Sequence, residues 1–360
     1  MHRRKTRAVR VGDAVIGGGA PITVQSMTKT RTDDIELTLR QIEELAALGC
    51  EIIRCAVPAR RTIPALEEIV GRSPIPVIAD IHFDPSLALA AMDAGAHGVR
   101  VNPCTMSDAG LLADVYRRAA ALGVKVRIGI NSGSVRRRKG LEVIDDGGED
   151  TAELMVSEAL RQCEIAESHG CSSIVLSLKA SSVSQTVEAY RRAAARCDYP
   201  FHIGVTAAGP PAESIVKSAI GIGSLLLDGI GDTVRVSMTG PPHREVEAAC
   251  DILYALELRR REGPEIISCP TCGRCEIDLE GIVSEVQERL ARSGAGGIKV
   301  AVMGCVVNGP GEAAEADIGI AGGRDFGVLF RGGRKICRAP ADRIADMLVE
   351  EVMGMAQDGD

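Results

Sequence analysis

The feature that most constrains the fold is a regular alternation of short β-branched runs with longer amphipathic stretches, beginning at residue 22. Short apolar runs indicate strands, and apolar residues spaced three and four apart indicate helices, so each repeat predicts one strand followed by one helix. Strands are predicted at residues 22–27, 51–57, 76–81, 98–102, 125–131, 173–179, 201–206 and 233–238, and the helices between them include 35–48, 86–94, 109–122, 151–168, 183–196 and 212–227.

Eight strand and helix units within about 250 residues predict a TIM (β/α)8 barrel, in which parallel strands close into a cylinder inside a ring of helices. A doubly wound open sheet is the alternative, because a local pattern does not show whether the sheet closes. Ahead of the first strand, residues 11–19 contain two glycine turns. They predict a hairpin that plugs the bottom of the barrel.

The 360 residues suffice for a barrel and a second, smaller domain. A charged stretch at residues 258–264 is predicted as the linker, which places the barrel at 1–260 and an α/β module at 261–360. The sequence contains no Trp and only four Phe and four Tyr. Both cores must therefore be built mainly from Ala, Val, Ile and Leu. In the second domain we expect helices at 282–291 and from 341, and strands at 298–303, 317–321 and 326–330.

Four cysteines in the second domain have spacing typical of a metal centre: Cys269, Cys272, Cys275 and Cys305. Two thiolates three residues apart, with a third that returns after a strand, suit an iron-sulfur cluster. A structural zinc site is the alternative, but it usually has a second Cys-x-x-Cys or a His pair. The spacing leaves the fourth ligand open between Cys275 and Glu312, which lies in a Gly-Pro turn after Cys305.

Polar side chains stand where the predicted strands end, which is the active-site face of a TIM barrel. Arginines buried there are costly unless an anion meets them, and several guanidinium groups suit a doubly phosphorylated small molecule. Asp80 and His82 end the third strand, and His82 is either a proton shuttle or a hydrogen-bonded histidine of the barrel. The expected anion ligands are Arg54, Arg100, Asn102, Arg127, Asn131, Ser132, Lys179, Thr206 and Ser237.

Net charge and composition indicate which kinds of partner and which cellular compartment are expected. The formal net charge is −7, and no basic stripe with interleaved aromatics is present, which argues against nucleic acid as a partner. The basic run at residues 136–139 is expected to be a solvated loop. Twelve cysteines without an apolar secretory segment indicate reduced thiols, and no run is long enough to span a membrane. We therefore expect a cytoplasmic protein.

Eight sequence motifs resemble those of the bacterial 4-hydroxy-3-methylbut-2-enyl diphosphate synthase family of the non-mevalonate isoprenoid pathway. The likeness extends over nearly the whole chain, and its last motif is highly specific. The motifs are Val-Gln-Ser-Met-Thr at 24–28, Ala-Asp-Ile-His-Phe at 79–83, Val-Arg-Val-Asn-Pro at 99–103, Arg-Ile-Gly-Ile-Asn-Ser-Gly at 127–133, Ser-Leu-Lys-Ala-Ser at 177–181, Val-Lys-Ser-Ala-Ile-Gly at 216–221, Cys-Pro-Thr-Cys at 269–272 and Gly-Cys-Val-Val-Asn-Gly-Pro-Gly-Glu at 304–312.

The resemblance implies a TIM barrel joined to a module like those of sulfite and nitrite reductases, which holds a 4Fe-4S cluster. Its ligands would be Cys269, Cys272, Cys305 and Glu312, leaving Cys275 without this role. Glu312, Asp80 and His82 would serve the chemistry. The implied reaction is reductive ring opening and dehydration of 2-C-methyl-D-erythritol 2,4-cyclodiphosphate, with two electrons from flavodoxin or ferredoxin. The family is also homodimeric, with the cluster module of one subunit over the barrel mouth of the other.

The sequence departs from the family pattern at two positions. Residues 206–209 are Thr-Ala-Ala-Gly where the family has Thr-Glu-Ala-Gly, so Ala207 replaces an expected glutamate, and Cys104 stands where the family has Gly. A general acid contributes about a hundredfold or more to a rate. A divergent or inactivated member that binds a diphosphate and a cluster is therefore one alternative function. A barrel with a zinc module, like those of pterin-dependent methyltransferases, is another.

Overall fold

The computed structural model describes residues 2–138, 150–261, 263–291, 293–305, 311 and 316–358. The chain forms two compact units, Met1–Leu258 and Arg259–Asp360. The division falls two residues before the boundary predicted from the charged linker.

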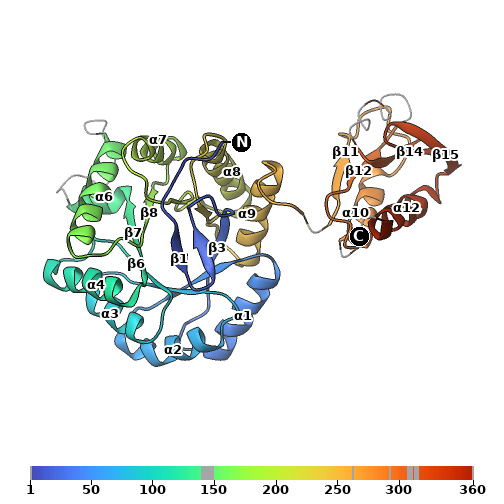
Figure 1. Ribbon diagram of the computed structural model, residues 1–360. Coiled ribbons are helices and arrows are strands. Elements are labelled where there is room, and N and C mark those ends of the chain that lie inside the picture. The colour runs from blue at the N-terminus through green and yellow to red at the C-terminus, as the bar shows by residue number, and fades with distance from the viewer. Residues whose placement is uncertain are drawn as a thin grey trace. The chain divides into compact units, whose positions relative to one another are not determined.

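Eight parallel strands form the core of the first unit (Figure 1). They are hydrogen-bonded in the order β8-β7-β6-β5-β4-β3-β10-β9, and a parallel bridge between Leu176 and Phe201 joins the two end strands. The predicted TIM barrel is confirmed, and the open-sheet alternative is wrong. All eight strands occur where they were expected, although the last two are much shorter than predicted. The strands are β3 (Thr23–Met27), β4 (Ile52–Ala56), β5 (Val77–Asp80), β6 (Gly98–Val101), β7 (Lys125–Asn131), β8 (Ile174–Lys179), β9 (His202–Ile203) and β10 (Thr233–Val234).

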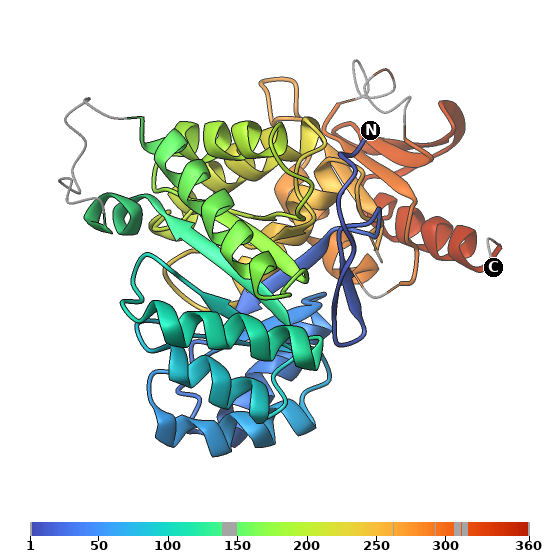
Figure 2. The ribbon, with the colours of Figure 1, turned by 60° about the vertical axis from the view of Figure 1, so that its left-hand side comes forward.

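Helices surround the strands on the outside (Figure 2). Most begin at an Asp or Ser whose side chain accepts a hydrogen bond from a backbone amide of the first turn, as Asp34, Asp108 and Ser182 do. The helices are α1 (Ile35–Ala47), α2 (Ile63–Arg72) after the 3-10 turn η1 (Arg60–Thr62), α3 (Pro85–Asp93), α4 (Ala109–Leu122), α5 (Ser132–Arg138), α6 (Thr151–Ser168), α7 (Val183–Ala194), α8 (Pro211–Leu227) and α9 (His243–Ala255).

The basic run predicted as a solvated loop is partly helical. Residues up to Arg138 belong to α5, and Arg136 is 4% exposed with its Nη1 donating to Thr151 Oγ1 at 3.1 Å. The expectation is wrong for Arg136, because the helix turns this side chain toward α6. Lys139 lies outside the described residues.

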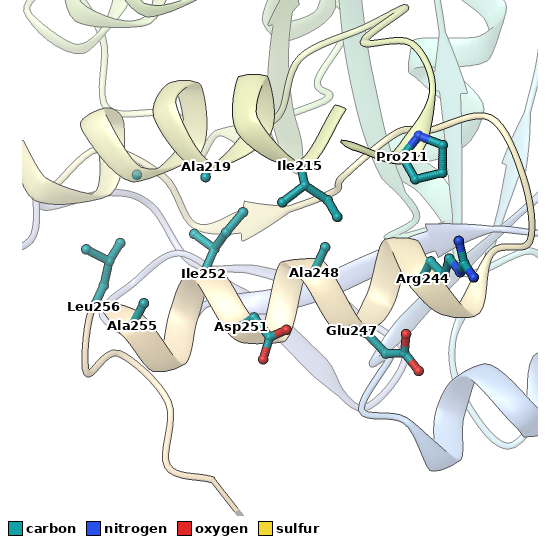
Figure 3. Close-up of a pocket in the computed structure, with 11 residues that line it drawn as sticks. Pro211, Ile215, Ala219, Arg244, Glu247, Ala248, Asp251, Ile252, Ala255 and Leu256 are labelled. Atoms are coloured by element: carbon teal, nitrogen blue, oxygen red, sulfur yellow. The ribbon is translucent and has the colours of Figure 1, made fainter. Parts of the chain in front are cut away.

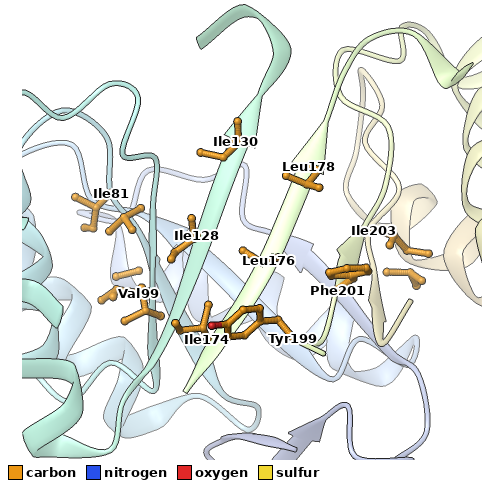
Figure 4. Close-up of a cluster of buried hydrophobic side chains, with 14 of the residues drawn as sticks. Ile81, Val99, Ile128, Ile130, Ile174, Leu176, Leu178, Tyr199, Phe201 and Ile203 are labelled. Carbon is orange, nitrogen blue, oxygen red and sulfur yellow. The ribbon is translucent and has the colours of Figure 1, made fainter. Parts of the chain in front are cut away.

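The main core lies between the strands and the helices. Alternate strand residues face outward, such as Ile128 and Ile130 on β7 and Leu176 and Leu178 on β8 (Figure 4). All four are fully buried. Because strand side chains alternate between faces, the residues between them point into the barrel, and these are largely polar.

The predicted hairpin is present as β1 (Val9–Val11) and β2 (Ala14–Ile16). In Figure 1, β1 crosses the middle of the ring of helices. Its apolar side chains pack on Ile52, Ile78 and Val175, which point inward from three barrel strands. The hairpin therefore closes the bottom of the barrel, as predicted.

The basic residues before the hairpin pack on the same end. Arg4 donates to the carbonyls of Cys197 and Tyr199 and lies over the Phe201 ring, 4.0 Å from its centroid. Arg7 pairs with Asp198 at 2.7 Å. These contacts link the first residues to the segment that leads into β9.

The described residues of the second unit include one five-stranded sheet and the helices α10 (Leu279–Leu290) and α12 (Ile344–Asp358). Its strands are hydrogen-bonded in sequence order, parallel from β11 to β13 and antiparallel from β13 to β15. Strands β11 and β15 were not predicted. The elements are β11 (Glu265–Ser268), α10 (Leu279–Leu290), β12 (Lys299–Met303), β13 (Ile318–Gly322), β14 (Phe326–Arg331), β15 (Arg334–Pro340) and α12 (Ile344–Asp358). Among the helices of the described residues, none could span a membrane.

Candidate functional site

Three of the predicted site residues meet at the carboxyl ends of β4, β5 and β6. Asp80 Oδ1 lies 3.6 Å from Arg54 Nε and 3.6 Å from Arg100 Nη1, and all three residues are less than 10% exposed. Burial alone would raise the pKa of Asp80, but Arg54, His82 and Arg100 together hold it well below its ordinary value. Burial also lowers the pKa of Arg54 to about 9, while Asp80 opposes that shift. Asp80 is therefore an ionised partner shared by two arginines.

His82 extends this group toward solvent. Its Nε2 lies 2.9 Å from Arg100 Nη1 and 3.2 Å from Asp80 Oδ2. Arginine can only donate, so a neutral ring accepts from Arg100 at Nε2, whereas a protonated ring donates to Asp80 from the same atom. The side chain is 45% exposed. His82 can therefore exchange a proton with a molecule at the mouth.

The residue after His82 has an unusual backbone conformation. Phe83 has φ +65°, in the left-handed region that residues with a Cβ seldom adopt, and its side chain is 69% exposed. Such conformations occur often at functional sites.

Glu245, in the first turn of α9, is a second buried carboxylate. It pairs with basic side chains that follow β3 and β10. Its oxygens lie 2.9 Å from Lys29 Nζ and 3.2 Å from Arg235 Nη2, and Oε1 accepts from the Met238 amide at 3.2 Å. Glu245 is 2% exposed. It holds Arg235 at the strand ends, and sequence analysis missed both Glu245 and Lys29, because a glutamate in an amphipathic helix resembles a solvent-facing one.

Lys179 ends β8 in the same region. It is 8% exposed, and burial together with Arg235, Arg54 and Arg100 lowers its pKa well below the usual value. A Cβ on Gly204 would lie 3.0 Å from Lys179 Nζ, so the glycine leaves room for the ammonium group. Lys179 therefore belongs to the same electropositive group.

Other predicted ligands have protein partners. Asn102 donates from Nδ2 to Ser134 Oγ at 3.2 Å and accepts from the Cys104 amide at 3.1 Å, so it organises a turn. Arg127 is 2% exposed and donates to Gln25 Oε1 at 3.4 Å, deeper in the barrel.

The remaining predicted ligands lie at the ends of their strands. Asn131 ends β7 and Ser132 begins α5. Thr206 donates from its amide to Ala180 O at 3.3 Å, and Ser237 O accepts from Ser214 Oγ at 2.8 Å. Among the described residues, none of these four side chains forms a hydrogen bond or ion pair with Asp80, Arg54 or Arg100.

Ala207, one of the two departures from the family pattern, is exposed and has φ +49°. It lies in the loop between β9 and α8, close in sequence to Thr206. A longer side chain in place of Ala207 would therefore start from an exposed position of this loop.

The barrel interior is strongly electropositive. Six basic side chains lie on its strands or directly after them, whereas the carboxylates Asp80 and Glu245 pair with only three of these, Arg54, Arg100 and Arg235. Such an excess of buried cations favours an anionic ligand. The six are Arg54, Arg100, Lys125, Arg127, Lys179 and Arg235.

Four of the five cysteines of the second unit follow the neighbouring strands β11 and β12, whereas Cys337 lies on β15. Cys269 follows β11 and Cys305 follows β12, and these strands are parallel with Ser268 opposite Val302. The amide of Gly304 donates to Cys269 Sγ at 3.3 Å, an interaction that stabilises a thiolate. Cys272 is exposed and Cys305 is half-buried.

Cys275 has a different environment from the other cysteines. Its thiol donates to Ile277 O at 3.3 Å, and a Cβ on Gly304 would lie 2.5 Å from its sulfur. Cys275 is thus packed against the loop that leads to Cys305. Glu312 lies outside the described residues, and within those residues no three His, Cys, Asp or Glu side chains are arranged to hold a metal ion.

The thiols nevertheless suit an iron-sulfur cluster in their chemistry. Several free cysteines lie on two adjacent loops, and a backbone amide points at one sulfur. Cluster sulfurs characteristically accept such hydrogen bonds, which tune their potential.

A pocket of about 530 Å³ lies elsewhere, between α8 and α9 on the outside of the barrel (Figure 3). Ile215 and Pro211 from α8 face Ala248 and Ile252 from α9, with Arg244 at one end. None of the predicted site residues lines it.

Both units match models of known protein families. The GcpE TIM-barrel domain model matches residues 6–250, and the GcpE protein C-terminal domain model matches residues 265–354. The 4-hydroxy-3-methylbut-2-en-1-yl diphosphate synthase (flavodoxin) of Aquifex aeolicus is 50% identical over 359 residues, covering 100% of this chain and 99% of the relative. The protein of the same name from Geobacter sulfurreducens is 51% identical, covering 97% and 98%.

Two solved structures each align with about two thirds of this chain. Dihydropteroate synthase from Xanthomonas albilineans aligns with a TM-score of 0.50 and 16% identity, covering 69% of this chain and 97% of that protein. The Yersinia pestis dihydropteroate synthase gives a TM-score of 0.50 and 12% identity, covering 69% and 98%. At these identities the likeness shows the fold and nothing further.

Proposed function

The chain belongs to the 4-hydroxy-3-methylbut-2-en-1-yl diphosphate synthase (GcpE) family, and from this premise we propose that it catalyses the reaction of its relatives. That reaction is the reductive ring opening and dehydration of 2-C-methyl-D-erythritol 2,4-cyclodiphosphate to 4-hydroxy-3-methylbut-2-enyl diphosphate. The proposed electron donor is flavodoxin, which forms part of the relatives' names, or a ferredoxin. The observation that carries the proposal is the surplus of buried cations at the mouth of a barrel of this family.

In this proposal the mouth binds the cyclic diphosphate through charge. Arg54, Arg100 and Lys179 supply positive charge, and Arg235 adds a fourth cation held by Glu245. Forked guanidinium donors match phosphate oxygens in pairs. Asp80 keeps Arg54 and Arg100 oriented before the substrate arrives, which lowers the cost of ordering them on binding.

Proton delivery is assigned to His82. The reaction releases one oxygen of the substrate as water, so protons must reach it. His82 is exposed, and its Nε2 is poised between a donor, Arg100, and an acceptor, Asp80. Either protonation state therefore finds a partner, which suits a group that gives up and regains a proton.

The 4Fe-4S cluster is proposed to be held by Cys269, Cys272, Cys305 and Glu312, and when bound it supplies single electrons to the substrate. The Gly304 amide would stabilise the charge on Cys269. Cys275, whose thiol is bonded to Ile277 O, is proposed to stay a packing residue.

The protein is further proposed to be a cytoplasmic homodimer. The support for a dimer is α8, where Ile215, Val216, Ile220 and Leu227 are each at least 44% exposed. Apolar residues exposed on one helix commonly mark an interface. Analytical ultracentrifugation measures the oligomeric state. A monomer at micromolar concentration would contradict the proposed dimer.

Turnover by anaerobically reconstituted protein with a strong reductant tests the function. We expect product from the cyclodiphosphate, and a rate raised about a hundredfold by Ala207→Glu, which restores a carboxylate beside Thr206. Product from the Ala207→Glu variant alone would favour the divergent-member alternative, motivated by Ala207 itself. Absence of product from both proteins would reject the proposal.

Cysteine variants test the ligand assignment separately. Cys305→Ser is expected to abolish the visible absorbance and the electron paramagnetic resonance signal of the reduced cluster. Cys275→Ser is the matched control and is expected to keep both. Equal loss in the two variants would contradict the ligand set that includes Glu312, and zinc without labile sulfide would revive the zinc-module alternative.

A further inference from the structure

A second group of buried polar side chains lies deeper in the barrel than the mouth. It consists of six inward-facing residues, each at most 5% exposed, which we name the lower cluster. The lower cluster is Thr23, Gln25, Lys125, Arg127, His202 and Thr233.

Strand register brings these residues together. Thr233 pairs directly with Thr23 on one side and with His202 on the other, so the three side chains lie next to one another on the same face of the sheet. From β7, Arg127 reaches across the barrel to Gln25 at 3.4 Å.

Lys125 completes the group. It begins β7, two residues before Arg127, and interacts electrostatically with His202. A Cβ on its pairing partner Gly98 would lie 3.2 Å from Lys125 Cδ, so this glycine gives the lysine room inside the barrel.

The region is enclosed from below. The hairpin β1–β2 packs on Ile52, Ile78 and Val175. Ile52 is the register partner of Gln25, and Val175 is that of Arg127. A ligand held by the lower cluster would therefore be shielded from solvent at the hairpin end.

The lower cluster has more hydrogen-bond donors than acceptors. Gln25 Nε2, Lys125 Nζ and Arg127 Nε can only donate, and none has a partner among the described residues. The hydroxyls of Thr23 and Thr233 and both ring nitrogens of His202 are likewise unpartnered there. The amide oxygen of Gln25 is already used by Arg127. Buried donors without acceptors are costly, so this set calls for an acceptor.

Charge favours a negative acceptor over a neutral one. The two carboxylates of the interior are engaged elsewhere: Asp80 with Arg54 and Arg100, and Glu245 with Lys29 and Arg235. Lys125 and Arg127 are left without a carboxylate among the described residues, and an uncompensated buried cation is strongly unfavourable. Burial and the nearby charge of Arg54 lower the pKa of Lys125 to about 7. The lowered pKa reflects the same unfavourable free energy of holding a cation there without a counter-ion.

We propose that the lower cluster binds one small monovalent inorganic anion of the size of chloride, held by Lys125 Nζ together with the unpartnered donors of Gln25, Arg127, Thr23 and Thr233. The enclosure below and the near-complete burial of every member favour a small ion over a diphosphate at this depth. The ion is a structural ligand that neutralises the interior beneath the mouth. The site is distinct from the substrate site and does not depend on the proposed function.

Anomalous diffraction tests the site directly. Crystals of the full chain with bromide replacing chloride are expected to show a bromide peak within hydrogen-bond reach of Lys125 Nζ. The peak is expected to persist when excess inorganic diphosphate is added. Bromide only at surface positions, a water in its place, or displacement by diphosphate would each overturn a separate anion site.

Thermal unfolding tests the same site in solution. Replacing gluconate by chloride at constant ionic strength, from 1 to 100 mM, is expected to raise the midpoint by about a few degrees, because a ligand bound only by the folded state stabilises it. Lys125→Met is expected to remove this dependence, and the exposed Lys335→Met to keep it. The same dependence in all three proteins would overturn the proposal.

A second variant keeps the test decisive if Lys125→Met does not fold. The double change Thr23→Val and Thr233→Val deletes two neighbouring hydroxyls without changing charge. It is expected to lower bromide occupancy at least severalfold. Unchanged occupancy and an unchanged midpoint would overturn the assignment to this cluster.

Discussion

At the scale of single residues, the most consequential side chain is Asp80, because among the described residues its carboxylate forms the ion pairs of both Arg54 and Arg100. Asp80→Asn preserves its shape but leaves two buried arginines uncompensated, which is expected to cost about 3–5 kcal/mol of unfolding free energy at pH 7. The folded-state pKa of Asp80 lies below its unfolded value of about 3.9, so its contribution is complete above that value and is lost as the pH falls below it. Urea unfolding at pH 7, 4 and 3 is expected to show the difference between parent and variant shrinking with acid.

The control for Asp80 is Asp93→Asn on the surface of α3. Asp93 pairs with Arg118 at 2.6 Å, but both side chains are more than 40% exposed. Its loss is expected to cost less than about 1 kcal/mol. Equal costs for the two variants, or a pH-independent cost for Asp80→Asn, would show that Asp80 is not the buried counter-ion.

At the scale of elements, the approach of β9 to β10 depends on Gly204. Its φ is +156°, and a Cβ there would lie 2.3 Å from the carbonyl oxygen of Arg235, a backbone atom that cannot move aside. Gly204→Ala is expected to lower the unfolding free energy by at least about 2 kcal/mol and to weaken diphosphate binding, because Lys179 Nζ is 3.0 Å from the same point. Denaturant unfolding and calorimetric titration with inorganic diphosphate measure the two effects.

Gly71→Ala in α2 is the matched comparison. No atom lies within 4 Å of a Cβ at this position. The change is expected to stabilise the protein by about 0.4–1 kcal/mol, because alanine has fewer unfolded conformations to lose. Stability changes of the same sign in both variants would contradict the steric role assigned to Gly204.

At the scale of the whole molecule, each unit has its own hydrophobic core. A unit with its own core is expected to fold alone. The fragment of residues 1–258 should therefore unfold in one cooperative calorimetric transition, at a midpoint within about 5 °C of the barrel transition in the full chain. A non-cooperative or much less stable fragment would show that the barrel needs the second unit.

The sequence by itself predicted the eight strands, the hairpin beneath them and the polar residues at the strand ends, and it favoured a barrel without showing that the sheet closes. It could do so because burial imposes a local period on apolar residues, and because parallel strands place their carboxyl ends together. Asp80, His82 and the arginines were predicted for this reason. The family resemblance added the ligand set, including Glu312 outside the described residues.

Only the tertiary structure decided which side chains meet. It joined Glu245 of α9 to Lys29 and Arg235, which are far apart in the chain, and it bonded Arg127 to Gln25 across the barrel. It also gathered Thr23, His202 and Thr233 beside Lys125, although none of them stood out in the sequence. The reason is physical: a local pattern records whether a side chain is buried, whereas its partner and its charge balance follow from strand register and barrel closure.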